Sequence, residues 1–213
     1  MKNRSDHTFW DSLAGRYDSF ISKFAKKTYA QSIKLMRQEL SADSKVLEIG
    51  TGTGIIAFAI IDLVHSIIAI DYAPGMIKTA RAKLEASGHK NLQFRKSTAT
   101  NIDLPDKSFN VIIASNVFHL LPEPTIVLRE IGRLLTDDGK IILPTYCHGQ
   151  NLKTHLLSAL MSMSGFKAAN KWSTTQFRNF VEQEGWHIEK EEIIKDKFPM
   201  SFLVASKNHA KFT

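Results

Sequence analysis

Three glycines that directly follow a short apolar run are the residues of this sequence whose type and spacing point most clearly to chemistry. Residues 46–54 read VLEIGTGTG, with glycine at positions 50, 52 and 54. Glycine is needed where the backbone must approach a ligand without a Cβ atom in the way, and a helix that starts behind such a loop offers unpaired N–H groups. The loop is therefore predicted to bind a nucleotide-like cofactor.

A carboxylate follows this loop at a distance that suits nucleoside recognition. Asp71 lies at the end of the next apolar run, where a carboxylate can accept hydrogen bonds from a ribose diol. Read from Gly52, the loop also gives the pattern Gly-x-Gly-x-x-Ala, so an NAD-dependent oxidoreductase is one interpretation. Glu48 favours a different kind of cofactor. Its carboxylate would attract a ligand that carries an ammonium and a sulfonium, and it would repel a pyrophosphate.

An alternation of short strands and longer helices is predicted to position these residues. Five β-branched runs predict strands at 45–49, 66–70, 92–94, 109–114 and 140–143. Apolar residues at helical spacing predict helices at 9–40, 55–63, 74–88, 124–135, 151–163 and 174–184, with a turn at 137–139. This order predicts a largely parallel sheet with helices on both faces. The last two runs, 186–194 and 200–205, have no helix between them and should pair antiparallel.

Composition limits the class of protein and its surroundings. The length of 213 residues predicts one domain, and 28 Lys and Arg against 21 Asp and Glu give a net charge of +7 that favours anionic partners of any kind. The single cysteine, Cys147, cannot form an internal disulfide and suits a reducing compartment. Residues 1–7 contain no apolar signal, and the longest apolar run, 55–61, is too short to span a bilayer. A cytoplasmic location is expected, with peripheral membrane contact left open.

Four motifs in order resemble the class I S-adenosylmethionine-dependent methyltransferases, in particular the type 11 group that includes ubiquinone/menaquinone methyltransferase-like proteins. They are residues 46–54, 69–76, 103–110 and 128–140, and the resemblance is close over 45–145. It implies a Rossmann-like, seven-stranded, mostly parallel sheet with helices on both faces and a C-terminal antiparallel hairpin, in a single methyltransferase domain (1–213). Its expected parts are an N-terminal helical cap (1–40), a cofactor-binding core (41–147), a substrate-cover insertion (148–172), and a C-terminal helix with antiparallel strands (173–213).

The resemblance also implies roles for single residues. In the family, the glycine loop holds the methionine part of S-adenosyl-L-methionine, which becomes S-adenosyl-L-homocysteine, and the acid in the place of Asp71 binds the ribose. Tyr72 and Met76 would lie against the adenine, and Thr98 stands where the family usually has Asp. Tyr17 and Asp18 resemble a pair that closes over the cofactor. The cofactor-binding residues expected on this basis are Tyr17, Glu48, Gly50, Thr51, Gly52, Gly54, Asp71, Tyr72, Met76, Thr98, Ala99 and Asn116. No metal is expected.

The acceptor of the methyl group is less clearly indicated. His119 is the expected general base, because the loop after the fourth strand faces the methyl group in the resembling fold, although a structural role is the alternative. Residues 115–121 lack the Asn/Asp-Pro-Pro-aromatic element of enzymes that methylate nucleic-acid bases, which disfavours nucleic acid as a partner. Leu and Met residues in 152–166 suit a small apolar, lipid-like or quinone-like acceptor, and burial of these residues as ordinary core is the alternative. A monomer or homodimer is expected. A non-catalytic adenosyl-cofactor-binding module stays as a further alternative.

Overall fold

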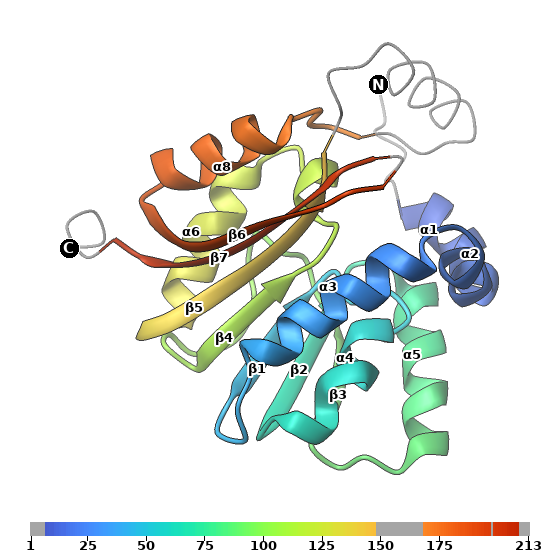
Figure 1. Cartoon of the computed structure of the whole chain (residues 1–213). Helices are drawn as coiled ribbons and strands as arrows, with labels where there is room; N and C mark the ends of the chain where they lie inside the picture. Colours follow the sequence, from blue (N-terminus) through green and yellow to red (C-terminus); the bar gives the residue numbers. More distant parts are fainter. Residues whose placement is uncertain (1–6, 148–167, 197, 209–213) are drawn as a thin grey trace, which may run out of the picture. The chain divides into compact units, whose positions relative to one another are not determined.

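The computed structural model describes residues 7–147, 168–196 and 198–208, and Figure 1 draws the others as a grey trace. The chain divides into two compact units. The first unit extends to Ile102 and the second begins at Asp103. No helix among the described residues combines the length and the apolar character needed to cross a bilayer. The predicted helix at 151–163, the apolar segment 152–166 and most of the expected substrate-cover insertion lie outside the described residues.

Three parallel strands form the centre of the first unit. Strand β1 (Lys45–Ile49) pairs with β2 (Ser66–Asp71), and β2 pairs with β3 (Leu92–Lys96). The register places Ile49 beside Ile70 and Asp71 beside Lys96. Four of the five residues of β1 are buried, which is why this strand reads as an almost continuous apolar run. The glycine loop and Asp71 therefore leave adjacent strands at the same end of the sheet.

Helices surround these strands in the order α1 (His7–Leu13), η1 (Ala14–Arg16), α2 (Tyr17–Phe24), α3 (Lys26–Gln38), α4 (Ile55–Ile60), η2 (Ile61–Leu63) and α5 (Pro74–Ser87). Helix α5 starts at a proline and ends at Gly88, whose φ of 73° is left-handed, as its sequence predicts. The helical stretch predicted over 9–40 is instead broken into several segments. Between α2 and α3, Ala25 has a φ of −131° and a ψ of 10°, which is not helical.

The second unit combines parallel and antiparallel pairing. Strand β4 (Phe109–Ala114) pairs parallel with β5 (Leu135–Tyr146). Strand β7 (Met200–Lys207) pairs antiparallel with both β5 and β6 (Trp186–Ile194). The described residues of this unit include the helical elements η3 (Phe118–Leu120), α6 (Pro124–Leu134) and α8 (Thr174–Gln183). The seven strands, mostly parallel with an antiparallel C-terminal pair, confirm the predicted Rossmann-like α/β class and the predicted C-terminal hairpin.

One prediction in this unit is wrong. Residues 137–139 were expected to form a turn after the helix, but β5 begins at Leu135 and runs through them. The pairing between β4 and β5 is irregular here, because it moves from Phe109 beside Leu135 to Val111 beside Lys140. Lysines hold the irregular stretch: Lys107 pairs with Asp137 at 2.7 Å, and Lys207 Nζ donates to the Leu135 carbonyl oxygen at 2.7 Å. These contacts come from residues far along the chain, which local sequence does not reveal.

Candidate functional site

The glycine loop leaves β1 in a conformation that only glycine adopts easily. Gly50, Gly52 and Gly54 have φ values of 70°, 56° and 86°, all left-handed. At Gly54 space is also limiting: a Cβ atom there would lie 2.6 Å from Cζ of Phe94 and 3.0 Å from Cε2 of Phe58. The loop is therefore packed directly on two aromatic rings, and its shape depends on the missing side chains.

The backbone N–H groups of this loop hold the loop itself in place. Gly50 and Thr51 both donate to the carbonyl oxygen of Ile70, at 2.8 and 3.0 Å, and Gly52 donates to Oδ2 of Asp71 at 2.8 Å. These three amides precede α4 (Ile55–Ile60), the helix whose first N–H groups the sequence analysis expects to be available to a ligand. Toward a ligand, the loop therefore presents mainly glycine backbone without Cβ atoms, next to the carboxylate of Asp71.

Asp71 connects the end of β2 to the loop. Its Oδ1 accepts from the amide of Ala73 at 2.9 Å, while Oδ2 accepts from Gly52. Burial raises the pKa of this carboxyl against the opposing effect of its backbone hydrogen bonds. The amide of Ser97 donates to the Asp71 backbone carbonyl oxygen at 3.0 Å, so the segment that continues into Thr98 starts beside Asp71. Backbone hydrogen bonds from Ala73, Gly52 and Tyr72 all lower the pKa of this carboxyl, and a carboxylate has about four lone-pair positions, so it can still accept a bond from a ligand hydroxyl.

Glu48 lies buried at the end of β1, with 2% of its surface exposed. Its Oε2 accepts a hydrogen bond from the Thr51 hydroxyl at 2.8 Å. Burial raises the pKa of Glu48 to about 8; the nearby charge of Asp71 acts in the same direction, and the Thr51 bond opposes it. At neutral pH the unliganded protein therefore carries Glu48 largely in its protonated form, and a cation placed nearby would favour ionisation.

This raised pKa predicts a pH dependence of stability. Between about pH 5 and 8 folded Glu48 binds more protons than it does in the unfolded chain, so its contribution to the free energy of unfolding falls as pH rises through this window. We expect Glu48→Gln to lose less stability than the wild type over the same range. Urea unfolding at several pH values measures this, with Glu85→Gln on the exposed side of α5 as the matched control. If the free energy of unfolding changed with pH equally in Glu48→Gln and the wild type, the raised pKa of Glu48 would be contradicted.

The N-terminal helices of the first unit pack on the glycine loop. A Cβ atom at Gly52 would lie 3.6 Å from Cε1 of Tyr17 and 3.9 Å from Sδ of Met76. Met76 is buried in a cluster with Ala14 and Ala73, and Trp10 and Tyr17 pack against that cluster. Tyr17 and Met76, which the sequence placed at the cofactor through the resemblance, thus meet beside Gly52.

A polar network fixes the same helices. Asp18 Oδ1 accepts from the Thr53 hydroxyl, and its Oδ2 pairs with Lys83 Nζ, both at 2.5 Å. Lys83 Nζ also donates to the backbone carbonyl oxygen of Thr53 at 2.8 Å. Nearby, Asp11 Oδ1 accepts from the amide of Gly75 at 2.6 Å, at the start of α5. Sequence reasoning missed Asp11, Thr53 and Lys83, because no spacing rule connects residues that lie 30 to 65 positions apart.

The remaining predicted residues are distributed over both units. In the first, Tyr72 is 37% exposed, Thr98 is exposed and Ala99 is half-buried. Asn116 and His119 belong to the second unit. Asn116 has a left-handed φ of 57°, and its backbone N–H donates to the Pro144 carbonyl oxygen at 2.7 Å. His119 is buried in η3. Within the described ranges, no three His, Cys, Asp or Glu side chains gather in a way that could hold a metal ion.

Comparisons with known proteins give a consistent result. A family described as "Methyltransferase domain" matches residues 40–196. The uncharacterized methyltransferase YcgJ of Bacillus subtilis is 31% identical over 105 residues, which is 49% of this chain and 42% of that protein. The phosphatidylethanolamine N-methyltransferase of Cereibacter sphaeroides is 29% identical over 100 residues, 46% of this chain and 49% of that protein.

The fold comparison agrees. The structure of a SAM-dependent methyltransferase from Aquifex aeolicus matches with a TM-score of 0.69 and 20% identity, over 91% of this chain and 97% of that one. The match to the curated relatives is partial, since the aligned regions span 42%, 58% and 49% of the length of three of them.

Proposed function

The chain belongs to the class I S-adenosylmethionine-dependent methyltransferase family, and on this basis we propose that it transfers a methyl group from S-adenosylmethionine to a small apolar, lipid-like or quinone-like acceptor. The observation that carries the proposal is the hydrogen bond from the Gly52 amide to Asp71 Oδ2. It joins the left-handed glycine loop to a buried carboxylate, so that one rigid assembly offers both a Cβ-free surface and an acceptor for hydroxyl groups.

The residues of the first unit fit this cofactor. Asp71 would accept a hydrogen bond from a ribose hydroxyl at a lone-pair position that the backbone amides of Gly52, Ala73 and Tyr72 do not use. Glu48 would favour a cationic ligand by ionising in response to it. Tyr17 would cover the loop and limit the access of water. When bound, S-adenosylmethionine supplies a methyl group on a positively charged sulfur, so the protein needs chiefly to align the acceptor.

Glu48 also argues against the NAD alternative. The negative charge of a pyrophosphate beside the loop would keep the Glu48 carboxyl neutral, so the buried carboxyl would not stabilise that ligand. A sulfonium and an ammonium would instead interact favourably with the ionised carboxylate. The extended assignment of cofactor residues, including Tyr72, Thr98, Ala99 and Asn116, is part of this proposal, as are the single domain over 1–213 and the substrate cover over 148–172.

A lipid-like acceptor is supported by two observations. The relative from Cereibacter sphaeroides is named for methylation of phosphatidylethanolamine, and other relatives are named for ubiquinone biosynthesis. In addition, residues 152–166 read LKTHLLSALMSMSGF, rich in Leu and Met, which suits contact with an apolar molecule.

His119 is the proposed general base within the second unit. It is 6% exposed, and its carbonyl oxygen accepts from the Asn170 amide at 3.0 Å, while the Asn170 side chain donates to the Leu121 carbonyl oxygen at 2.6 Å. Asn170 therefore holds the backbone of η3. His119→Gln should lower the turnover rate without changing the affinity for the donor. It should also remove the fall in turnover at low pH that a histidine base produces. Asn170→Ala, which loosens the same loop and leaves the imidazole, should not remove that fall.

An acceptor screen tests the proposed function. The protein is incubated with S-adenosylmethionine labelled in its methyl group and with phospholipids, quinone precursors or polar metabolites, and the label in each acceptor is counted. We expect transfer to lipid or quinone-like molecules. Transfer only to polar metabolites or nucleic acid would overturn the acceptor class, and donor binding without transfer to any acceptor in the panel would favour a non-catalytic binding module.

A further inference from the structure

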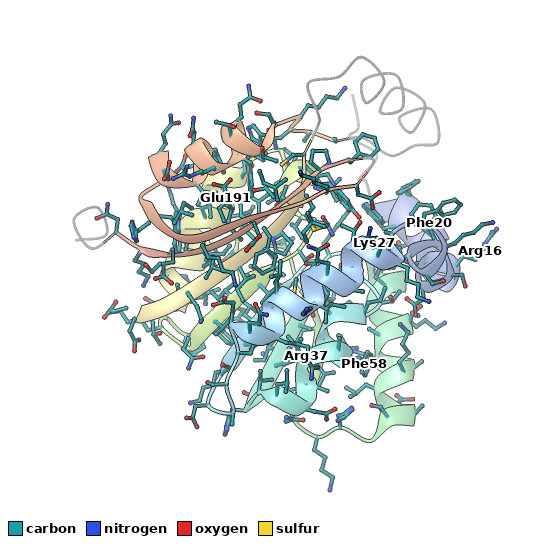
Figure 2. The ribbon with its side chains drawn as sticks, in the orientation of Figure 1. Arg16, Phe20, Lys27, Arg37, Phe58 and Glu191 are labelled. Atoms are coloured by element: carbon teal, nitrogen blue, oxygen red, sulfur yellow. The ribbon has the colours of Figure 1, made fainter. Side chains whose placement is uncertain are left out.

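We propose that the end of η1, the outer face of α2 and the first turn of α3 form a docking surface for an anionic lipid bilayer. The surface consists of Arg16, Phe20, Lys23, Phe24, Lys26 and Lys27, all exposed (Figure 2 labels Arg16, Phe20 and Lys27). The inference deepens the proposed function, because a bilayer is where a lipid-like acceptor is found, but binding to lipid is measured without any methyl transfer.

The apolar part of this surface is a pair of phenylalanine rings on one side of α2. Phe24 is 63% exposed and Phe20 is 41% exposed. The two rings lie 5.1 Å apart, so they form one continuous apolar ridge on consecutive turns. Ile21 is buried on the other side of the same helix. A helix with one apolar side against its own unit and a second apolar ridge facing outward has more apolar surface than its packing uses.

The charged part of the surface is strongly positive. Residues 16–27 contain four cations, Arg16, Lys23, Lys26 and Lys27, and a single acid, Asp18. Asp18 pairs with Lys83 and accepts from Thr53, so its charge is engaged at the glycine loop and does not offset the exposed cations. Lys23 Nζ lies 5.4 Å from the centroid of the Phe24 ring. Lys23 thus places a positive charge directly beside the phenylalanine ridge.

This combination selects one occupant. Phenylalanine rings beside lysines are the pattern with which short helices lie at the boundary between lipid headgroups and acyl chains, with rings inserted and ammonium groups among anionic headgroups. A second copy of the chain would place four cations against four cations. A nucleic acid would satisfy the cations, but the rings of Phe20 and Phe24 pack on each other, which leaves neither ring free to stack on bases from both sides.

The same helix also contacts the candidate cofactor site. Tyr17 borders Gly52, and Asp18 holds Thr53 and Lys83, so both residues at the start of α2 touch the loop or its partners. Lipid bound on the outer face would therefore hold a helix whose inner face covers the glycine loop. This arrangement would favour the position of α2 over the glycine loop when the protein meets its acceptor at a membrane.

Co-sedimentation of the full chain with vesicles tests the proposal. We expect binding to phosphatidylcholine vesicles that contain about one-third phosphatidylglycerol, weakening as salt is added, and little binding to phosphatidylcholine alone. Phe20→Ser with Phe24→Ser should reduce this binding by about tenfold or more, and Lys26→Glu with Lys27→Glu should do the same. Ile193→Ser, which removes a side chain that is 48% exposed on β6, is the matched control and should bind like the wild type.

Three results would overturn the proposal: no sedimentation of the wild type with anionic vesicles at low salt, wild-type binding by the double phenylalanine variant, or binding to a DNA duplex that depends on both rings as strongly as vesicle binding does. Thermal unfolding of each variant confirms that it is folded. Because no donor is present, a failure here with methyl transfer intact removes only the docking surface, and vesicle binding without methyl transfer removes only the proposed function.

Discussion

Replacing Asp71 with alanine is expected to weaken the binding of S-adenosylmethionine by roughly 10- to 100-fold, equivalent to about 1.4 to 2.8 kcal/mol. The change removes the acceptor for ribose hydroxyls and also the bonds that Gly52 and Ala73 donate to it. The loop is then less firmly held in the binding conformation, so two losses act together. Isothermal titration calorimetry of the variant and the wild type gives the two dissociation constants.

Two control variants separate these effects from a general loss of structure. Asp62→Ala removes a carboxylate whose side chain is 82% exposed in the same unit, and it should bind the donor like the wild type. Asp71→Asn retains one acceptor oxygen in the same place and should lie between the wild type and Asp71→Ala. Unchanged donor affinity in a folded Asp71→Ala protein would contradict the ribose role.

Gly54→Ala is expected to lower the free energy of unfolding by about 2 to 5 kcal/mol. A left-handed conformation costs a residue with a Cβ atom about 1 to 2 kcal/mol, and overpacking a filled core costs about 1 to 3 kcal/mol more. Both costs apply, because φ is 86° and the new atom would lie 2.6 Å from Phe94 and 3.0 Å from Phe58. Urea unfolding monitored by circular dichroism measures the difference.

Gly88→Ala is the matched control, since Gly88 has a φ of 73° and a Cβ atom there would meet nothing within 4 Å. It should show only the conformational part of the loss, about 1 to 2 kcal/mol. The double variant Gly54→Ala with Phe94→Leu should regain part of the packing loss. Equal losses at Gly54 and Gly88 would show that the contact with the two rings has no energetic weight.

Much of the fold could be predicted from the sequence, because the signals were local. Strands β1, β4 and β6 have the predicted bounds, since each is a β-branched or alternating run between clear breaks. The antiparallel pairing of β6 and β7 was predictable because no helix is expected between the runs 186–194 and 200–205. The stretch 137–139 was mispredicted because Lys107 and Lys207, from elsewhere in the chain, hold it in an irregular strand.

The candidate site was predictable only in part. The positions of the glycines and of Asp71 follow from strand ends, which parallel pairing brings to one edge. The network of Asp18, Thr53 and Lys83 could not be found in this way, because it depends on how α2 and α5 pack around the loop. The internal use of the loop amides was also hidden, since spacing does not show which carbonyl oxygen each N–H group meets.

The most direct test of the central claim is a calorimetric titration of the wild-type chain, once with S-adenosylmethionine and once with NAD. The glycine loop, Asp71 and Glu48 predict one bound S-adenosylmethionine with micromolar affinity and no measurable heat from NAD. Micromolar binding of NAD with none of S-adenosylmethionine would contradict the claim.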